Sequence, residues 1–349
     1  MMKKSRTTLK DIANQLNISI STVSRSLNDH PNINPETKKK VKDLAKKLDY
    51  HPNLFALNLL QKKTHIIGII VPEITSYFFS SIITGIQDVL RDTDYNLLIS
   101  QSEESFKEEV AIIGNFLNVG IDGLLVSPAS KTKKFKHFSK LMNRGIPVVV
   151  FDRDCPGLEA DKVLADDYDG AFQAVDYLIK SGCKRIAHLA GPANLTTAQH
   201  RLKGYLDALK ENNIPITEDY IQHVKGFTHE AGIKPTKKLF ELETPPDAIF
   251  AVNDCIAISA MHTAQSLNLK IPSDISIVGV DDEPHSSYFT PALSTIWQPV
   301  YSMGILAVKI LIKRIEEETR TSEFRYEIFK PELIIRDSSR KLPKKITRN

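Results

Sequence analysis

Polar side chains follow the ends of several apolar runs in the longer, C-terminal part of the chain. Asp152 comes directly after PVVVF, Asn253 after DAIFAV and Asp281 after DISIVGV. Arg201 follows RIAHLAGP and a short loop. If the runs are parallel strands, these side chains gather at the carboxyl ends of the strands, where α/β sheets bind ligands. Carboxylates, an amide and a guanidinium can satisfy the hydroxyl groups of a sugar or a nucleoside.

Each of these side chains also has a simpler structural use. Asp152 and Asp281 could cap turns, which is a common use of Asp after a strand. Asn253 could cap a helix that begins near Cys255, and Arg201 could pair with a nearby acid. Taken singly, capping is as good an explanation as ligand binding for the acids. Their occurrence at several strand ends together favours the ligand site.

An enzyme with Asp152 and Asp281 as acid and base groups is the alternative. The chain contains no GxSxG, GxxxxGK[ST], HExxH or GxGxxG pattern, so no motif supports a nucleophile, a phosphate loop or a metal centre. His188 lies inside an apolar run and is expected in the core. We therefore expect no catalytic residue, no metal site and no cofactor.

A different kind of pattern occupies the N-terminal stretch from Leu9 to Tyr50. Apolar residues recur at helical spacing in LKDIANQL, and a second short helix is expected over SISTVSRSL. A third helix begins near Pro35, a favourable first-turn residue. Two short helices joined by a tight turn and packed on a third are typical of the helix-turn-helix, whose second helix enters the DNA major groove.

The charge distribution agrees with this interpretation. The net charge is +4, but residues 1–64 hold 13 basic and 5 acidic side chains, and the last ten residues add five basic ones. The stretch between, 65–339, carries 28 basic and 37 acidic side chains. Basic charge therefore concentrates at the helix-turn-helix end, where DNA phosphates would lie.

Composition indicates an ordinary folded protein of two or three domains. The 349 residues are 42% hydrophobic and 25% charged, and the apolar runs are far shorter than a membrane span. The basic N-terminus has no apolar segment typical of a secretory signal, so we expect a cytoplasmic protein. The three cysteines show no CxxC spacing and are expected to be free thiols.

From His65 onward, short apolar runs alternate with amphipathic helices. About eight such runs can be counted between residues 66 and 335. This alternation predicts parallel sheets covered by helices. Since so many strands are too many for one open sheet of this style, we expect two lobes with a break near residues 152–167.

The N-terminal string LKDIANQLNISISTVSRSLN, followed by Tyr50-His51-Pro52-Asn53, resembles the lactose repressor (LacI/GalR) family of bacterial transcription regulators. The resemblance extends over about residues 8–338. It implies an N-terminal all-α helix-turn-helix domain plus an α/β two-lobed periplasmic-binding-protein-like core with parallel sheets. The expected parts are a helix-turn-helix domain at 1–50, a hinge helix at 51–64, an effector-binding and dimerisation domain at 65–339 and a basic tail at 340–349. Within the core, lobe 1 takes about 65–165 and 298–326, and lobe 2 takes about 166–297 and 327–339.

The resemblance also implies which residues contact DNA. Ile20, Ser21 and Arg25 occupy positions that face bases in relatives. Arg25 can make two hydrogen bonds to a guanine edge, although a phosphate contact is nearly as good an explanation. Leu59 corresponds to a leucine that the family wedges into the minor groove, a known way of kinking DNA. The complete predicted DNA-binding set is Lys10, Ile20, Ser21, Thr22, Ser24, Arg25, Asn28, Asn53, Ala56 and Leu59.

For the effector, the resemblance adds two aromatic residues to the strand-end polar groups. The predicted effector-binding set is Phe78, Asp152, Arg201, Phe227, Asn253 and Asp281, with Gln298 as a weaker candidate. The function implied is a sequence-specific transcription regulator, most simply a repressor. Its partners are operator DNA, a second copy of the chain and a sugar or sugar phosphate as effector. A nucleoside or purine effector is the alternative; a sugar-binding protein without DNA activity and a carbohydrate-active enzyme are weaker ones.

Overall fold

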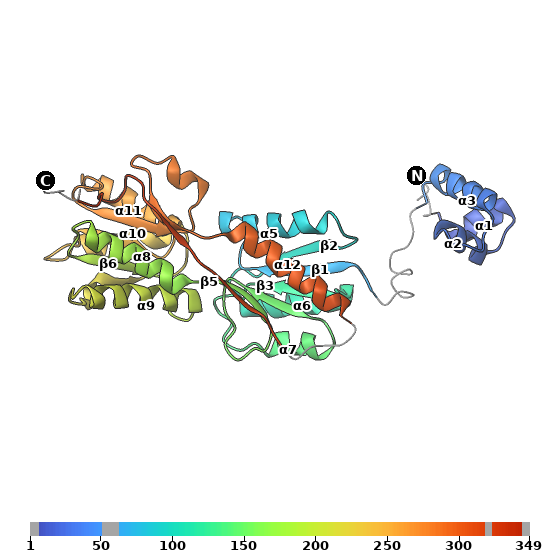
Figure 1. The fold of residues 1–349 in the computed structure, drawn as a ribbon, viewed down its shortest axis with the longest axis horizontal. Helices are drawn as coiled ribbons and strands as arrows, with labels where there is room; N and C mark the ends of the chain where they lie inside the picture. The colour runs from blue at the N-terminus through green and yellow to red at the C-terminus, as the bar shows by residue number, and fades with distance from the viewer. Residues whose placement is uncertain (1–6, 51–62, 318–322, 344–349) are drawn as a thin grey trace, which may run out of the picture. The chain divides into compact units, whose positions relative to one another are not determined.

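The computed structural model describes residues 7–50, 63–317 and 323–343 (Figure 1). It forms two compact units, Met1–Thr64 and His65–Asn349, which are described separately. The hinge residues Asn53, Ala56 and Leu59 lie outside the described residues. None of the helices in the described parts is long and apolar enough to cross a membrane.

The first unit contains three helices, α1 (Leu9–Leu16), α2 (Ile20–Leu27) and α3 (Pro35–Lys47). Helix α1 begins with a capping box in which the Thr8 hydroxyl and the Asp11 carboxylate each accept a backbone N–H. It ends at Asn17, whose φ of 53° is left-handed. This turn allows α2 to begin only four residues after α1 ends, as the sequence predicted for a helix-turn-helix.

A small core holds the three helices together. Ile12 of α1, Val23 of α2 and Val41 of α3 are all fully buried. Each helix therefore contributes one apolar face and leaves its opposite face to solvent, which is the division that the helical spacing of the sequence predicted.

The second unit consists of two six-stranded sheets, each forming one lobe, within its described residues. The first sheet has the order β11-β5-β4-β3-β1-β2 and the second has the order β12-β10-β9-β8-β6-β7. All neighbouring strands are parallel except β10 and β12. The strands are β1 (Ile66–Val71), β2 (Asn96–Gln101), β3 (Gly123–Val126), β4 (Val148–Phe151), β5 (Asp161–Ala165), β6 (Ile186–Ala190), β7 (Ile221–His223), β8 (Ala248–Ala251), β9 (Ser276–Val280), β10 (Ser294–Trp297), β11 (Tyr326–Phe329) and β12 (Glu332–Ile334).

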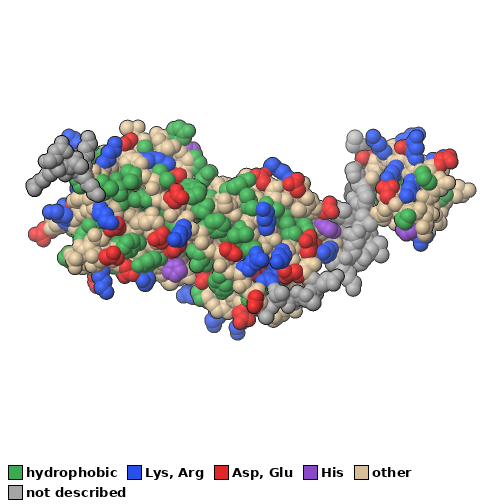
Figure 2. All heavy atoms as spheres, viewed as in Figure 1, with side chains coloured by type: hydrophobic (Ala, Val, Ile, Leu, Met, Phe, Trp, Pro, Cys, Tyr) green, Lys and Arg blue, Asp and Glu red, His purple; other side chains and the backbone are tan. Residues whose placement is uncertain are grey.

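Helices cover these sheets, and their buried faces make the core with the central strands. The helices of the second unit are α5 (Tyr77–Leu90), α6 (Phe106–Val119), α7 (Lys136–Asn143), α8 (Asp167–Lys180), α9 (Thr196–Glu211), α10 (His229–Phe240), α11 (Asp254–Ser266) and α12 (Val300–Glu316), with short 3-10 turns at Glu218–Tyr220 and Pro284–Ser287. Hydrophobic and charged side chains are interspersed over the face shown in Figure 2. The predicted fold class, a helix-turn-helix unit and a two-lobed α/β core, is confirmed.

The chain passes between the two sheets three times, after β5, after β10 and after β11. The third passage differs from the sequence-based expectation. The chain was expected to enter the second lobe at about residue 327. The structure has β11 pairing with β5 in the first sheet up to Phe329, whereas β12 pairs with β10 from Glu332. Pro331 separates the two strands, because proline cannot donate a ladder hydrogen bond.

Helices α5 and α12 cross at very short range in the first lobe. A Cβ atom added to Gly304 would lie 2.3 Å from the carbonyl oxygen of Ile82, and one added to Gly85 would lie 2.3 Å from that of Tyr301. The obstacles are backbone atoms, which cannot rotate away. Each glycine is therefore needed for the close approach of α12 to α5.

Gly304→Ala should lower the free energy of unfolding by about 1–3 kcal/mol, because the added methyl group forces the two helices apart. Urea denaturation of the full chain measures the change. Gly114→Ala in α6 is the matched control, since its added Cβ meets nothing within 4 Å, and it should be neutral or stabilising. Equal effects of the two substitutions would show that the helix crossing does not depend on Gly304.

Candidate functional site

One face of α2 is free for contact with DNA within the described part of the first unit. Ile20 is 48% exposed, and the side chains of Ser21 and Arg25 are also exposed. Val23 and Ser26 lie on the opposite face and are buried. The helix therefore presents an apolar group, a hydroxyl and a guanidinium on one side, which suits a helix that enters a major groove.

The start of α2 is held by a network of hydroxyl groups. The Ser19 side chain accepts a hydrogen bond from the Thr22 backbone N–H at 3.1 Å and lies 2.8 Å from the hydroxyls of Ser21 and Thr22. The predicted contacts Lys10 and Asn28 are exposed, whereas Thr22 and Ser24 are half-buried. The placement of these residues suits the predicted roles, which stay predictions.

The second unit contains a cavity of about 300 Å³ between its two lobes. This volume is at the lower end of the range typical for small-molecule sites. All six residues of the predicted effector-binding set line it: Phe78, Asp152, Arg201, Phe227, Asn253 and Asp281. The cavity therefore brings together residues that lie up to about 200 positions apart in the sequence.

Arg201 is buried at the wall of the second lobe, where it is held by several groups. Its guanidinium donates to Asp167 from Nε at 2.7 Å and lies 2.7 Å from the same oxygen through Nη2. It also donates to the carbonyl oxygen of Val252, and Asp281 lies 3.9 Å away. The pairing with an acid that the sequence left open is thus present, although it is buried and not on the surface. Arg201 joins the start of α8, the end of β8 and the loop after β9.

Asp152 and Asp281 have unusual backbone conformations, with φ values of 63° and 110°. Non-glycine residues seldom adopt such angles, and Asp tolerates them better than most. Both turns direct a carboxylate to the cavity. Burial raises the pKa of Asp152 to about 6 and that of Asp281 well above its usual value. The positive charges of the nearby arginines lower both pKa values and so act against this increase. Hydroxyl groups of a ligand would replace the water that these carboxylates have lost.

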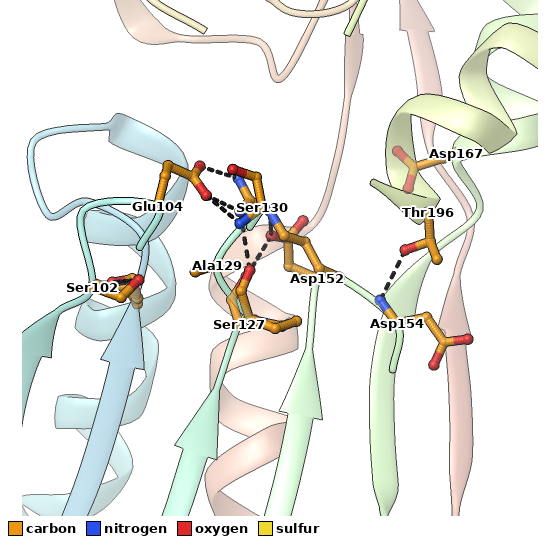
Figure 3. A network of polar contacts seen from close by, with 12 residues as sticks. Ser102, Glu104, Ser127, Ala129, Ser130, Asp152, Asp154, Asp167 and Thr196 are labelled. Atoms are coloured by element: carbon orange, nitrogen blue, oxygen red, sulfur yellow. Dashed lines mark hydrogen bonds and ion pairs between the residues drawn. The ribbon is translucent and has the colours of Figure 1, made fainter. Parts of the chain in front are cut away.

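Buried Arg153 and half-buried Glu104 form a second ion pair that the predicted set did not include. Glu104 is labelled in Figure 3. Arg153 donates two hydrogen bonds to Glu104, both at 2.8 Å. Burial alone would raise the pKa of Glu104, but these bonds lower it. Glu104 also accepts the backbone N–H of Ser130 at 2.6 Å. The pair therefore fixes the loop after β3 against the end of β2.

The aromatic residues of the cavity are already in contact with neighbouring groups. Phe78 is 6% exposed and packs edge-on against Phe79 with ring centroids 5.2 Å apart. The Phe227 ring faces the guanidinium of Arg153, whose central carbon is 5.7 Å from the ring centroid. Because Arg153 belongs to the first lobe and Phe227 to the second, this cation–π contact joins the lobes.

Two of the predicted candidates have structural roles as well. The Oδ1 of Asn253 accepts the N–H of Ile256 and caps α11, as the simpler interpretation of this residue proposed. It still lines the cavity. Gln298 does not line the cavity, but it donates a hydrogen bond to Asp281 from behind at 3.1 Å. His188 is buried in the core, stacked on Phe250, as expected.

Polar contacts close the cleft at the edge of the cavity. The Asp154 backbone N–H donates to the Thr196 hydroxyl at 3.1 Å, and the Asn194 side chain donates to the Ser130 carbonyl oxygen. Figure 3 shows Thr196 and Asp167 on the opposite side of the cleft from Ser127 and Asp152. No cluster of His, Cys, Asp or Glu residues suited to a metal ion occurs in the described part of the chain.

Residues 8–53 match the family model described as bacterial regulatory proteins, lacI family, and residues 175–339 match the periplasmic binding protein-like domain. The catabolite control protein A of Priestia megaterium is 34% identical over 89% of this chain and 93% of that protein. The chain belongs to the LacI family of bacterial regulatory proteins. Its helix-turn-helix and its two-lobed core are therefore those of a DNA-binding transcription regulator.

Other relatives and structures agree with this assignment. The probable transcriptional repressor ExuR of Bacillus subtilis is 35% identical over 96% of this chain and 99% of that protein. The complex of the regulator CelR with cellobiose has a TM-score of 0.73 at 26% identity, covering 96% of this chain and 100% of that one. The Lac repressor dimer bound to operator has the same fold, with a TM-score of 0.84 at 23% identity over 96% and 99% of the two chains.

Arg201→Ala should lower the free energy of unfolding by about 3–5 kcal/mol, because it leaves the buried carboxylate of Asp167 without its cation. Denaturant titration of the full chain measures this loss. Arg91→Ala removes an exposed pair with Asp88 and should cost less than about 1 kcal/mol. A comparably small effect of Arg201→Ala would mean that the buried cluster is not needed for the fold.

Proposed function

We propose that this LacI-family regulator is a repressor whose operator binding is controlled by a sugar or sugar phosphate held between the two lobes. The observation that carries the proposal is the cavity, whose buried carboxylates, amide and guanidinium come from both lobes. Two relatives support a sugar. One is the ribose operon repressor of Bacillus subtilis, which is 33% identical, and the other is the cellobiose complex of CelR.

The aromatic contacts favour a sugar over a nucleoside or purine. A purine ring would need an open aromatic face on which to stack. Phe78 is largely covered, and the Phe227 ring already faces Arg153. The available lining is mainly hydrogen-bonding, which suits a polyhydroxy ligand.

The effector would act by shifting the population of lobe arrangements. It can do so only by binding one arrangement more tightly than another. Asp281 lines the cavity and accepts a hydrogen bond from Gln298, which lies on the passage from β10 to α12. A ligand that moves Asp281 would therefore act directly on the segment that connects the lobes.

We propose that the ligand is released unchanged, so that the protein is not an enzyme. The relatives are named as repressors. The buried acids are engaged by neighbouring groups: Ser127 donates to Asp152 at 2.8 Å, and Gln298 donates to Asp281. Acting on operator DNA, the protein would work in the cytoplasm.

The working unit would be a homodimer, because one helix-turn-helix reads half of a symmetric operator. The edge strand β2 offers a surface for the second copy. Ile99 on this strand is 37% exposed, and exposed Ile74 donates its backbone N–H to Gln101 at the end of the strand. An open strand edge with apolar side chains is suited to association with another chain.

Selection of genomic DNA fragments by the full-length protein tests the function. At about 150 mM salt, non-specific phosphate binding is weak, and we expect enrichment of a palindromic site. Repeating the selection with a mixture of sugars or of nucleosides should change the enrichment only with the sugars. Enrichment of no site under any of these conditions would contradict the proposed function.

Arg25→Ala should weaken the preference of the protein for one base pair in each half-site. The difference in binding free energy between the preferred base and the others should fall by about 1–3 kcal/mol. The measurement is a titration of operator variants substituted at each position. Lys39→Ala, on the exposed side of α3, is the control and should weaken all sequences alike or leave them unchanged. A uniform loss for Arg25→Ala would instead assign Arg25 to a phosphate.

Ile99→Glu should dissociate the dimer, because it places a charge in an apolar contact. Analytical ultracentrifugation at micromolar concentration measures the change. Ile216→Glu replaces an isoleucine that is 50% exposed in the second lobe, and this control should remain dimeric. A dimer that persists in Ile99→Glu and dissociates in Ile216→Glu would place the interface elsewhere.

A further inference from the structure

Both acidic and basic side chains line the cavity. Near the passages between the lobes lie Asp152 and Asp281, each with 12% of its side chain exposed. Two exposed lysines lie on the loops at the edge: Lys131 follows β3 in the first lobe, and Lys225 follows β7 in the second. The cavity lining thus combines largely buried acids with an exposed lysine from each lobe.

Among the cations that line the cavity, these two lysines are the ones that no ion pair engages in the described residues. The arginines of the cavity are both engaged, Arg153 with Glu104 and Arg201 with Asp167. Within the described residues, neither Lys131 nor Lys225 has an ion pair or a side-chain hydrogen bond. A cation that lines a ligand cavity without a protein partner is available to a negative group of the ligand.

Glu73 is the acidic residue of the lining that could oppose this arrangement. Burial and the charge of Glu104 raise its pKa, Arg153 lowers it, and Glu283 adds a smaller increase. The largest influences on the pKa of Glu73 are thus burial, Glu104 and Arg153. Glu73 belongs to the Glu104–Arg153 side of the cavity.

Two helix N-termini lie at the edge of the cavity. Ser76 and Thr228 are the N-cap residues of α5 and α10, and both line the cavity. In the described structure neither side chain caps its own helix. The first turn of α5 contains no acidic residue, so its N–H groups and dipole favour a negative charge in front of it. In α10 the Glu230 carboxylate already accepts its own backbone N–H and a hydrogen bond from Thr228, which lowers the pKa of Glu230.

We propose that the effector is an anionic polyhydroxy compound, whose carboxylate or phosphate lies between Lys131 and Lys225 while its hydroxyl groups face Asp152, Asp281 and Asn253. This inference rests on the proposed function and specifies its ligand. The two lysines come from opposite lobes, so an anion between them attracts both and cancels their mutual repulsion. The negative group would therefore itself favour the closed arrangement, which gives the effector the differential affinity that a switch needs.

Calorimetric titration of the full-length protein with matched ligands tests the charge. Each set has one ring in three forms: glucose, glucuronate and glucose 6-phosphate, and the corresponding galactose compounds. We expect an acid form to bind at least about tenfold more tightly than its neutral parent. The two acid forms separate a carboxylate from a phosphate as the preferred group. Neutral sugars that bind as tightly as both acid forms would overturn the inference, as would the failure of every acid form to bind.

The double variant Lys131→Met/Lys225→Met should lose about tenfold to a hundredfold in affinity for the acid form and leave binding of the neutral sugar unchanged. Lys133→Met/Lys234→Met has the same net charge, alters exposed lysines outside the cavity lining, and should bind like the unaltered protein. Equal losses of affinity in both double variants would mean that only the net charge of the protein matters. This outcome would overturn the assignment of Lys131 and Lys225 to the negative group. Operator binding of every variant is measured in parallel. If the acid forms fail to bind while operator binding is intact, the inference is contradicted. If the unaltered protein does not recognise an operator, the proposed function is contradicted.

Discussion

The site depends on the ion pair and the hydrogen bonds of the buried Arg201 guanidinium. A charge removed from water is costly unless it is paired and fully hydrogen-bonded. Arg201 meets this requirement by bonding to Asp167, at the start of α8, and to the Val252 carbonyl, after β8, with Asp281 close by. Three separate segments are therefore fixed relative to one another before any ligand arrives, and the second lobe presents a preorganised wall.

The contacts between the lobes differ from the contacts within each lobe. Within each lobe, strands and helices share buried apolar clusters. Across the cleft, the described contacts include the Asp154–Thr196 bond, the Asn194–Ser130 bond and the contact of Arg153 with Phe227. Polar contacts near solvent contribute little net free energy, because water can replace them. Rigid lobes joined by such contacts can change their arrangement at low cost, and a ligand of moderate affinity can bias that equilibrium.

The central strands could be predicted from sequence because they are continuous apolar runs, buried on both faces. The strands that are not such continuous apolar runs are short and lie at or near sheet edges. Among them, β7 has three residues, none of them buried, and β11 alternates between exposed and half-buried positions. The six predicted effector residues follow strands or match family strings. Glu104, Lys131 and Lys225 lie on loops whose course depends on distant bonds, such as the Ala129 N–H to Glu109, and no local pattern reveals those bonds.

Asp254 shows how burial connects the cavity to the passage between the lobes. It is fully buried directly after Asn253, and burial raises its pKa to about 7. Its carboxylate accepts hydrogen bonds from Ser286, Thr295 and the Glu283 N–H. The cap of α11, the loop after Asp281 and strand β10 are thus tied to one side chain. Since β10 leads to Gln298 and then α12, these bonds connect the cavity wall of the second lobe to the segment that enters the first lobe.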